Sequence, residues 1–282
     1  MGNAVAIVAD RLGWEERLLI QAAPDFGLRA DWVNDESLGL GDPDAPSVKD
    51  YDLLLVRSRS YTRGGLIATL AEAAGVRTLN TARAIHACEN KAALRALLHT
   101  AGVPVPDFRL VLSRTDFTRA LAELELPLVL KPVFGGMGKR VTLLRDADTA
   151  QSVYDYVEDL GHAFEQAGLV EPYLGGSSVR CLVVGRELVG AAEFESGGTD
   201  WRTNAALGNK HRALAHDPDI LKIVDGVVAE LGPGIYGVDL FRTPDGLLVN
   251  EVNHAPAFRA VASATGADIA SAIGRWLQEL LA

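Results

Sequence analysis

Residues 236–253 read YGVDLFRTPDGLLVNEVN, and this stretch decides the fold of the carboxyl-terminal half of the chain. Two largely apolar segments, residues 236–242 and 247–253, flank the letters Thr-Pro-Asp-Gly. Proline, aspartate and glycine are typical turn residues, so the stretch predicts an antiparallel β-hairpin.

The turn of this hairpin decides which polar side chains share a face. Glu251 and Asn253 are two residues apart, so they lie on the same face of their strand. A three-residue loop centred on Asp245 puts Asp239 opposite Glu251. A two-residue loop made of Asp245 and Gly246 turns Asp239 to the other face instead.

The first of these registers predicts a metal site. Two carboxylates directly opposite each other repel, and a hard divalent cation removes that cost. Mg²⁺ prefers oxygen ligands, so Asp239, Glu251 and Asn253 would make a magnesium site. The alternative is a solvated strand face with acids of no special role.

A second candidate site lies in KPVFGGMGK, residues 131–139. Lys131 lies in a predicted strand at residues 128–132, and three glycines follow within four residues, at Gly135, Gly136 and Gly138. Glycines let backbone N–H groups approach phosphate oxygens closely. The loop matches neither the Walker A nor the Rossmann pattern, because a strand follows it rather than a helix. The alternative is an ordinary glycine hairpin with a lysine on an edge strand.

A third candidate is Glu-Pro-Tyr-Leu, residues 171–174, at the end of another predicted strand. Because Pro172 has no backbone donor, it leaves neighbouring backbone groups free to bind something other than a strand. The edge of an adenine ring is one such partner. An edge strand without a ligand is the alternative.

The order of predicted elements divides the chain into three parts. Strands and helices alternate over the first part, which predicts a parallel sheet, whereas the rest mixes hairpins and helices. We expect an α/β domain at residues 1–82, a central α+β part with the glycine loop at 83–175, and a C-terminal α+β part with the metal site at 176–282.

Composition excludes several classes of protein. The chain has 282 residues, 48% of them hydrophobic, and a net charge of −10. A disordered chain has fewer apolar residues, and a broad nucleic-acid surface needs a basic face. The two cysteines, Cys88 and Cys181, are too few for a disulfide scaffold. No apolar run is long enough to span a membrane and no signal peptide is apparent, so we expect a cytoplasmic protein that binds neither nucleic acid nor membrane.

The candidate residues occur in an order that resembles the ATP-grasp superfamily. The residues that carry the resemblance are Lys91, Lys131 with its glycine loop, Glu171, Arg180, Asp239, Glu251 and Asn253. The RimK/LysX branch is the most similar, and within it the LysX-type ligases, which act on amino-group carrier proteins. The stretches that support this branch are residues 56–58, 87–91, 203–205, 238–241, 250–254 and 265–269.

The resemblance implies an ATP-grasp fold. An N-terminal parallel α/β domain, the pre-ATP-grasp domain, would precede two α+β subdomains that clamp ATP. ATP and Mg²⁺ are the implied cofactors. The positions implied for ATP are Lys91 and Lys131 on the phosphates, Gly135, Gly136 and Gly138 over the γ-phosphate, and Glu171 with the backbone of Tyr173 and Leu174 on adenine.

Further roles follow from the same resemblance. Asp239, Glu251 and Asn253 would bind one or two Mg²⁺ ions, and Arg180 would stabilise the oxygens of an acyl phosphate. Five residues are candidates for binding the carboxylates of the amino acid and of the carrier, and each could equally be an ordinary surface residue: Arg57, Ser58, Arg202, Asn204 and Arg259.

The implied activity is that of an ATP- and Mg-dependent carboxylate–amine ligase. It would join α-aminoadipate, or glutamate, to the C-terminal glutamate of a small acidic carrier protein, and it would act as a dimer or tetramer. The alternatives are a RimK-like ligase for a peptide or cofactor and a non-catalytic nucleotide-binding module. Ser178 and Leu207 stand where the branch usually has Asp and Arg, and Lys210 or Arg212 would have to replace that arginine.

Overall fold

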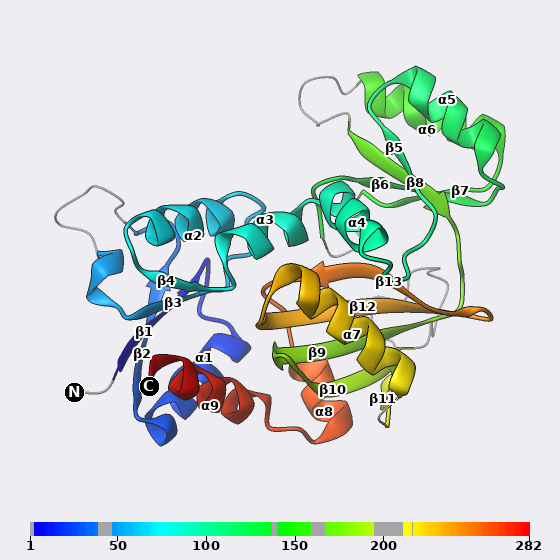
Figure 1. Ribbon diagram of the computed structural model, residues 1–282. Helices are drawn as coiled ribbons and strands as arrows, with labels where there is room; N and C mark the ends of the chain where they lie inside the picture. Colours follow the sequence, from blue (N-terminus) through cyan, green and yellow to red (C-terminus); the bar gives the residue numbers. More distant parts are fainter. Residues whose placement is uncertain (1–2, 39–46, 137–139, 160–166, 195–210, 216) are drawn as a thin grey trace.

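A computed structural model of the chain describes residues 3–38, 47–136, 140–159, 167–194, 211–215 and 217–282 (Figure 1). The strands within these ranges form three sheets. Figure 1 shows the first sheet in blue beside the N-terminus, a long sheet in green to orange, and a smaller lobe that carries α5 and α6.

The first sheet is parallel, with strand order β2-β1-β3-β4. Its strands are β1 (Asn3–Ala9), β2 (Leu28–Asn34), β3 (Leu53–Val56) and β4 (Arg77–Leu79). The parallel sheet predicted from the alternation of elements is confirmed. All four residues of β3 are buried, because a parallel sheet is covered by helices on both faces.

Alternate residues of β1 face two different layers of helices. Val5 and Ile7 pack with α1 (Trp14–Ala22) and α9 (Ile269–Leu281). Ala6 and Val8 pack with α2 (Arg63–Ala73) and α3 (Ala82–Glu89). The last helix of the chain therefore covers the first sheet, which places the C-terminus beside the N-terminal part (Figure 1).

The second sheet is antiparallel, with strand order β5-β8-β6-β7. Its strands are β5 (Arg109–Val111), β6 (Leu128–Pro132), β7 (Thr142–Leu144) and β8 (Gly168–Pro172). It packs on α5 (Arg114–Glu123) and α6 (Ala147–Asp159) around Phe117 and Tyr154. Because β6 and β8 are both internal strands, Lys131 and Glu171 do not lie on a sheet edge.

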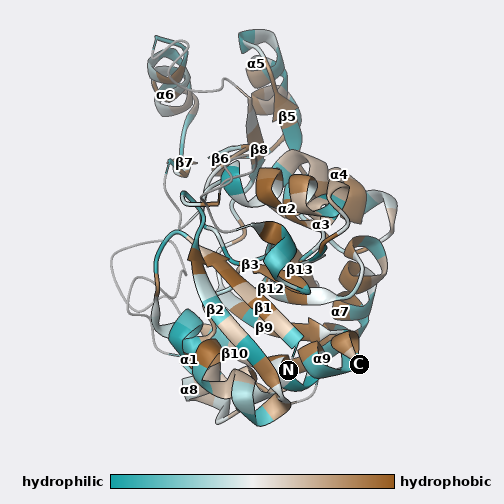
Figure 2. Ribbon diagram, turned by 90° about the vertical axis from the view of Figure 1, so that its left-hand side faces the viewer, coloured by the Kyte–Doolittle hydropathy of each residue, from teal (hydrophilic) through white to brown (hydrophobic). Residues whose placement is uncertain are grey.

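The third sheet is antiparallel, with strand order β11-β10-β9-β12-β13. Its strands are β9 (Ser177–Gly185), β10 (Glu187–Phe194), β11 (His211–Ala213), β12 (Gly234–Thr243) and β13 (Gly246–Asn253). One face packs on α3, α4 (Lys91–Thr100) and α7 (Pro218–Leu231). The other packs on α8 (Arg259–Thr265) and α9. Figure 2 views the molecule from the side of the first sheet and shows the central strands of the first and third sheets mostly in brown, as expected for sheets covered on both faces.

The hairpin of β12 and β13 forms as predicted, but its turn differs from both of the expected turns. Thr243 pairs with Gly246, so the loop is the two residues Pro244 and Asp245. A regular ladder from that turn would put Asp239 opposite Asn250. The register shifts by one residue between Asp239 and Leu240, which is a β-bulge.

Candidate active site

Three neighbouring strands place Arg180, Asp239 and Glu251 in one row. Asp239 of β12 pairs with Glu251 of β13 on one side and with Arg180 of β9 on the other. Asn253, two residues beyond Glu251, extends this row and lies 3.2 Å from Asp239 Oδ2 and 3.4 Å from Glu251 Oε1 through its Nδ2. The structure thus brings together the residues predicted to bind metal, through the bulge rather than through a three-residue turn.

Arg180 binds Asp239 with two parallel hydrogen bonds. Its Nε and a terminal nitrogen donate to the two carboxylate oxygens, each at 2.6 Å. Such a planar, two-pronged contact is the geometry in which arginine binds carboxylate or phosphate most strongly. The Asp239 carboxylate raises the pKa of Arg180, although burial acts in the opposite direction.

The two carboxylates of the row, Asp239 and Glu251, repel each other. Burial raises the pKa of Glu251, and the negative charge of Asp239 raises it further. An acid held in this way gains from a nearby cation. The donor set of two carboxylates and one amide oxygen fits the hard-oxygen preference of Mg²⁺.

The neighbouring sheet presents Lys131 to this row. Lys131 of β6 forms an ion pair with Glu171 of β8. Its Nζ also donates to Asn250 Oδ1 at 2.9 Å and lies 5.3 Å from the centre of the Phe241 ring. Asn250 is the bulge residue of β13, so the bulge joins the second and third sheets at the lysine.

Arg95 of α4 binds the same two residues from the other side. It donates to Glu171 Oε2 at 3.1 Å and to the backbone oxygen of Asn250 at 3.0 Å. Its guanidinium also lies 6.0 Å from the ring centre of Phe108. Arg95 is 3% exposed and Glu171 is 1% exposed, so this is a buried network.

Lys91 anchors the glycine loop. Asn90 ends α3 and caps α4 by accepting a hydrogen bond from Ala93 N–H, so Lys91 is the first residue of α4. The Lys91 ammonium donates to the backbone oxygen of Gly135. Burial lowers the pKa of Lys91, and the carboxylate of Glu251 opposes this effect.

The glycine loop is described only in part. Gly135 has φ +153°, and a side chain at Gly136 would approach the Tyr61 hydroxyl at 3.3 Å. The loop therefore lies close to the N-terminal part of the chain. Gly138 lies outside the described residues.

The residues predicted to hold adenine have other partners in this structure. Glu171 binds Lys131 and Arg95. The N–H of Tyr173 donates to the Pro127 backbone oxygen at 2.9 Å, and Leu174 follows it after β8 ends. The backbone N–H of Tyr173 is thus occupied in this arrangement.

Arg57 and Ser58, predicted to bind substrate carboxylates, are buried at the carboxyl end of β3. Arg57 donates to Glu16 Oε1 at 2.8 Å and to the Pro256 backbone oxygen at 3.1 Å. Ser58 donates to the Asp35 carboxylate. Arg57 therefore ties α1 to the segment after β13.

The other three candidates for substrate binding give less structural information. Arg259 is exposed and lies 5.4 Å from the ring centre of Trp14. Arg202 and Asn204 lie outside the described residues, as does Leu207.

Three residues beside this site, Arg95, Asn250 and His254, were not among the predicted site residues. Arg95 follows Lys91 by four positions, so helical periodicity puts both on one face, and that spacing was the available indication. Asn250 and His254 lie in the stretch 250–254 that carries the family resemblance, but no structural partner was predicted for either. His254 directly follows Asn253, and its Nε2 lies 3.3 Å from Oε1 of the buried Glu89.

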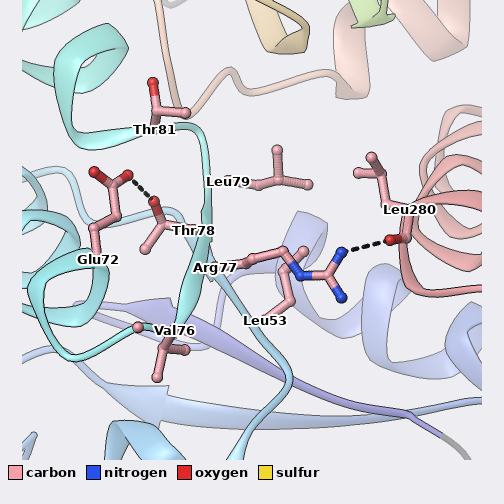
Figure 3. Close-up of a pocket in the computed structure, with 9 residues that line it drawn as sticks. Leu53, Glu72, Val76, Arg77, Thr78, Leu79, Thr81 and Leu280 are labelled. Atoms are coloured by element: carbon pink, nitrogen blue, oxygen red, sulfur yellow. Dashed lines mark hydrogen bonds between the residues drawn. The ribbon is translucent and has the colours of Figure 1, made fainter.

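A cavity of about 410 Å³ lies elsewhere, at the start of β3 and β4 (Figure 3). Arg77 donates there to the Leu280 backbone oxygen at 2.7 Å, at the end of α9. Glu72 accepts hydrogen bonds from Thr78 and from Ala82 N–H. These hydrogen bonds link β4 to α9 and α2 to α3. The cavity lies at the amino ends of β3 and β4, whereas Arg57 follows the carboxyl end of β3. We therefore assign a structural role to the residues that line this cavity.

Comparison with known proteins agrees with this geometry. Residues 5–87 match the family description "LysX preATP-grasp domain", and residues 88–277 match "RimK-like ATP-grasp domain". The chain is 28% identical to the glutamate–LysW ligase ArgX of Sulfurisphaera tokodaii over 278 residues, 98% of each protein. It is 27% identical to the α-aminoadipate–LysW ligase LysX of the same organism over 281 residues, again 98% of each.

A solved structure shares the whole fold. The RimK domain ATP-grasp protein of Sphaerobacter thermophilus superposes with a TM-score of 0.80 at 31% identity, covering 97% of this chain and 98% of that one. The predicted ATP-grasp fold with a pre-ATP-grasp domain is confirmed. Within the described residues, every helix is too short or too polar to cross a membrane. The chain belongs to the RimK-like ATP-grasp family of ATP-dependent ligases.

Proposed function

We propose that this protein is an ATP- and Mg²⁺-dependent ligase that joins an amino acid to the C-terminal glutamate of a small acidic carrier protein. The amino acid is α-aminoadipate or glutamate. The observation that carries the proposal is the hydrogen bond across two sheets from Lys131 to Asn250, the residue directly before Glu251 of the Arg180–Asp239–Glu251 row. Two relatives that align with 98% of the chain are named as ligases for one carrier, LysW. The substrates in their names differ only in the amino acid.

The positive groups of the site suit a nucleoside triphosphate. Lys91 and Lys131 would hold the phosphates, with the amides of Gly135 and Gly136 beside them. Arg180 would bind the oxygens of the phosphoryl group in transfer. Phosphoryl transfer needs mainly positioning and charge neutralisation, and these residues supply both.

The acidic row would hold the metal. Asp239, Glu251 and Asn253 offer two carboxylates and an amide oxygen, and the raised pKa of Glu251 indicates that its charge lacks full compensation. Bound there, Mg²⁺ would offset phosphate charge.

The reaction needs no protein nucleophile. An oxygen of the carrier carboxylate attacks the γ-phosphorus, the bond to the β,γ-bridging oxygen breaks, and ADP leaves. The amine of the amino acid then attacks the carbonyl carbon of the acyl phosphate, inorganic phosphate leaves, and the nitrogen loses a proton. Arg180 stabilises the negative oxygens in both steps. We further propose that the enzyme works in the cytoplasm as a dimer or tetramer.

Release of ADP tests the proposal. The protein is given Mg-ATP with an acidic carrier ending in glutamate, with one amino acid at a time, and with each reactant omitted in turn. The proposal expects sustained ADP release only with carrier and α-aminoadipate, or carrier and glutamate. Release that needs a peptide and no carrier would identify a RimK-like peptide ligase instead, and no release under any condition would favour a nucleotide-binding module.

A further inference from the structure

Two cations share one buried carboxylate at the proposed nucleotide site. The Lys131 ammonium pairs with Glu171 Oε1, and the Arg95 guanidinium binds Glu171 Oε2 at 3.1 Å. Both cations also contact Asn250, Lys131 through the side-chain oxygen and Arg95 through the backbone oxygen. The trio of Lys131, Arg95 and Glu171 thus carries one excess positive charge.

The two cations differ in how firmly they are fixed. Arg95 lies within α4, is 3% exposed, and has further contacts with the Pro106 backbone oxygen at 3.5 Å and with the face of Phe108. Lys131 is also buried, at 8% exposed, and its Nζ lies 5.3 Å from the centre of the Phe241 ring. It lies near the end of β6, however, directly before the segment that leads into the glycine loop, and its flexible stem ends in a point charge. The lysine is therefore the cation that can change partner.

A change of partner by Lys131 has an electrostatic consequence. If Lys131 moves to a phosphate, Glu171 loses one of its two counterions while remaining 1% exposed. A buried carboxylate without a partner is strongly unfavourable. Arg95 remains on the other carboxylate oxygen, so the charge of Glu171 stays compensated.

We propose that Arg95 is a positioning residue that holds Glu171 so that Lys131 can leave it for the phosphates of ATP. This inference rests on the proposed placement of ATP and makes the role of Lys131 more specific. Arg95 touches neither nucleotide nor substrate in this account. Without Arg95, binding ATP through Lys131 would leave Glu171 unpaired, and nucleotide affinity would fall.

Binding of Mg–AMP-PNP, a non-hydrolysable ATP analogue, measured by titration calorimetry tests this inference. We expect Arg95→Met to weaken binding about tenfold, the range found for coupled neighbours. Arg109→Met is the matched control, because Arg109 lies in the second sheet and pairs with the exposed Glu123. It should bind the analogue like the wild type.

The double variant Arg95→Met/Glu171→Gln separates positioning from a merely structural role. Neutralising Glu171 removes the carboxylate that retains Lys131, so the double variant should bind the analogue several-fold more tightly than Arg95→Met alone. Arg95→Lys, which keeps the charge, should bind more tightly than Arg95→Gln. Wild-type affinity of Arg95→Met, a double variant no better than Arg95→Met, or equal affinities of the Lys and Gln variants would each overturn the inference.

Folding and the carrier reaction are controlled separately. Melting temperatures accompany each titration, and if Arg95→Met does not fold, Arg95→Gln with and without Glu171→Gln gives the same comparison. Analogue binding requires neither carrier nor amino acid. Failure of the carrier reaction with the expected binding pattern would therefore overturn the proposed acceptor alone, and the converse result would overturn only the role of Arg95.

Discussion

Asp239 and Glu251 lie directly opposite each other on β12 and β13 because Asn250 is an extra residue in the second strand. The bulge does two things at once. It brings the acids into register, and it turns Asn250 toward Lys131 and Arg95 of the neighbouring elements. Bulges are common beside active sites for this reason, since they redirect a side chain without breaking the sheet.

The acidic row is expected to be essential for turnover. Asp239→Asn and Glu251→Gln should each reduce kcat of ADP release by roughly 100-fold to 1,000-fold, because each removes a charged oxygen ligand of the proposed metal. Asp245→Asn, in the exposed turn of the same hairpin, is the control and should keep wild-type kcat. Wild-type turnover in both site variants would show that these acids bind no catalytic metal.

The same acidic row should lower the free energy of unfolding when no metal is bound. In metal-free buffer Glu251→Gln is expected to raise the free energy of unfolding by about 1 kcal/mol at neutral pH, because the raised pKa means that the folded state disfavours the charged carboxyl. The gain should shrink as the pH falls through that raised pKa, since the wild-type carboxyl then takes up a proton. Urea titrations with chelator at several pH values measure this. A less stable variant at neutral pH would contradict the account.

Arg57 is expected to stabilise the fold through Glu16. Burial raises the pKa of Glu16, but the charge and hydrogen bond of Arg57 outweigh burial, so the pKa is lowered overall. A lowered carboxyl pKa stabilises the folded state above the unfolded pKa and loses that effect as the pH falls through the folded value. Glu16→Gln should therefore cost about 3 kcal/mol at neutral pH, and this difference should shrink in acid.

An exposed ion pair provides the comparison for Glu16. Glu123→Gln breaks the ion pair with Arg109, in which both side chains are about two-fifths exposed. This substitution should change the free energy of unfolding by less than about 1 kcal/mol. Urea unfolding at neutral pH measures both variants. Equal effects of the two substitutions would refute a buried structural role for the Glu16–Arg57 pair.

An acyl phosphate should be trapped before the amine is added. With Mg-ATP, carrier and hydroxylamine but no amino acid, the protein is expected to convert the terminal carboxylate of the carrier to a hydroxamate. Arg180→Met should slow this by roughly 100-fold, because it removes the guanidinium charge proposed to stabilise the phosphoryl oxygens. Mass spectrometry of the carrier detects the product. Wild-type hydroxamate formation by Arg180→Met would remove Arg180 from the phosphoryl step.

Much of the fold could be predicted because local patterns and tertiary structure agree. The unbroken Leu-Leu-Leu-Val run of β3 predicts a strand buried on both faces, and the parallel sheet has it there. The Thr-Pro-Asp-Gly letters predict the hairpin of β12 and β13. Because side chains alternate along a strand, Glu251 and Asn253 lie on the same face whichever turn the hairpin has.

The remaining features depend on contacts between distant segments. The bulge at Asn250 arises where β13 meets Lys131 and Arg95, and no glycine marks its place in the sequence. Arg57 is a candidate for substrate binding by the family resemblance, yet Glu16, far away in the chain, binds its guanidinium. Glu171 likewise has partners from α4 and β6 that no local pattern contains.

The most direct test of the central claim is the intact mass of the carrier after incubation with the protein, Mg-ATP and a mixture of α-aminoadipate and glutamate. The account predicts a carrier heavier by one residue of either amino acid, joined at its C-terminal glutamate, together with one ADP for each bond. Asp239→Asn should give no heavier carrier. An unmodified carrier in the presence of wild-type protein that hydrolyses ATP would contradict the account.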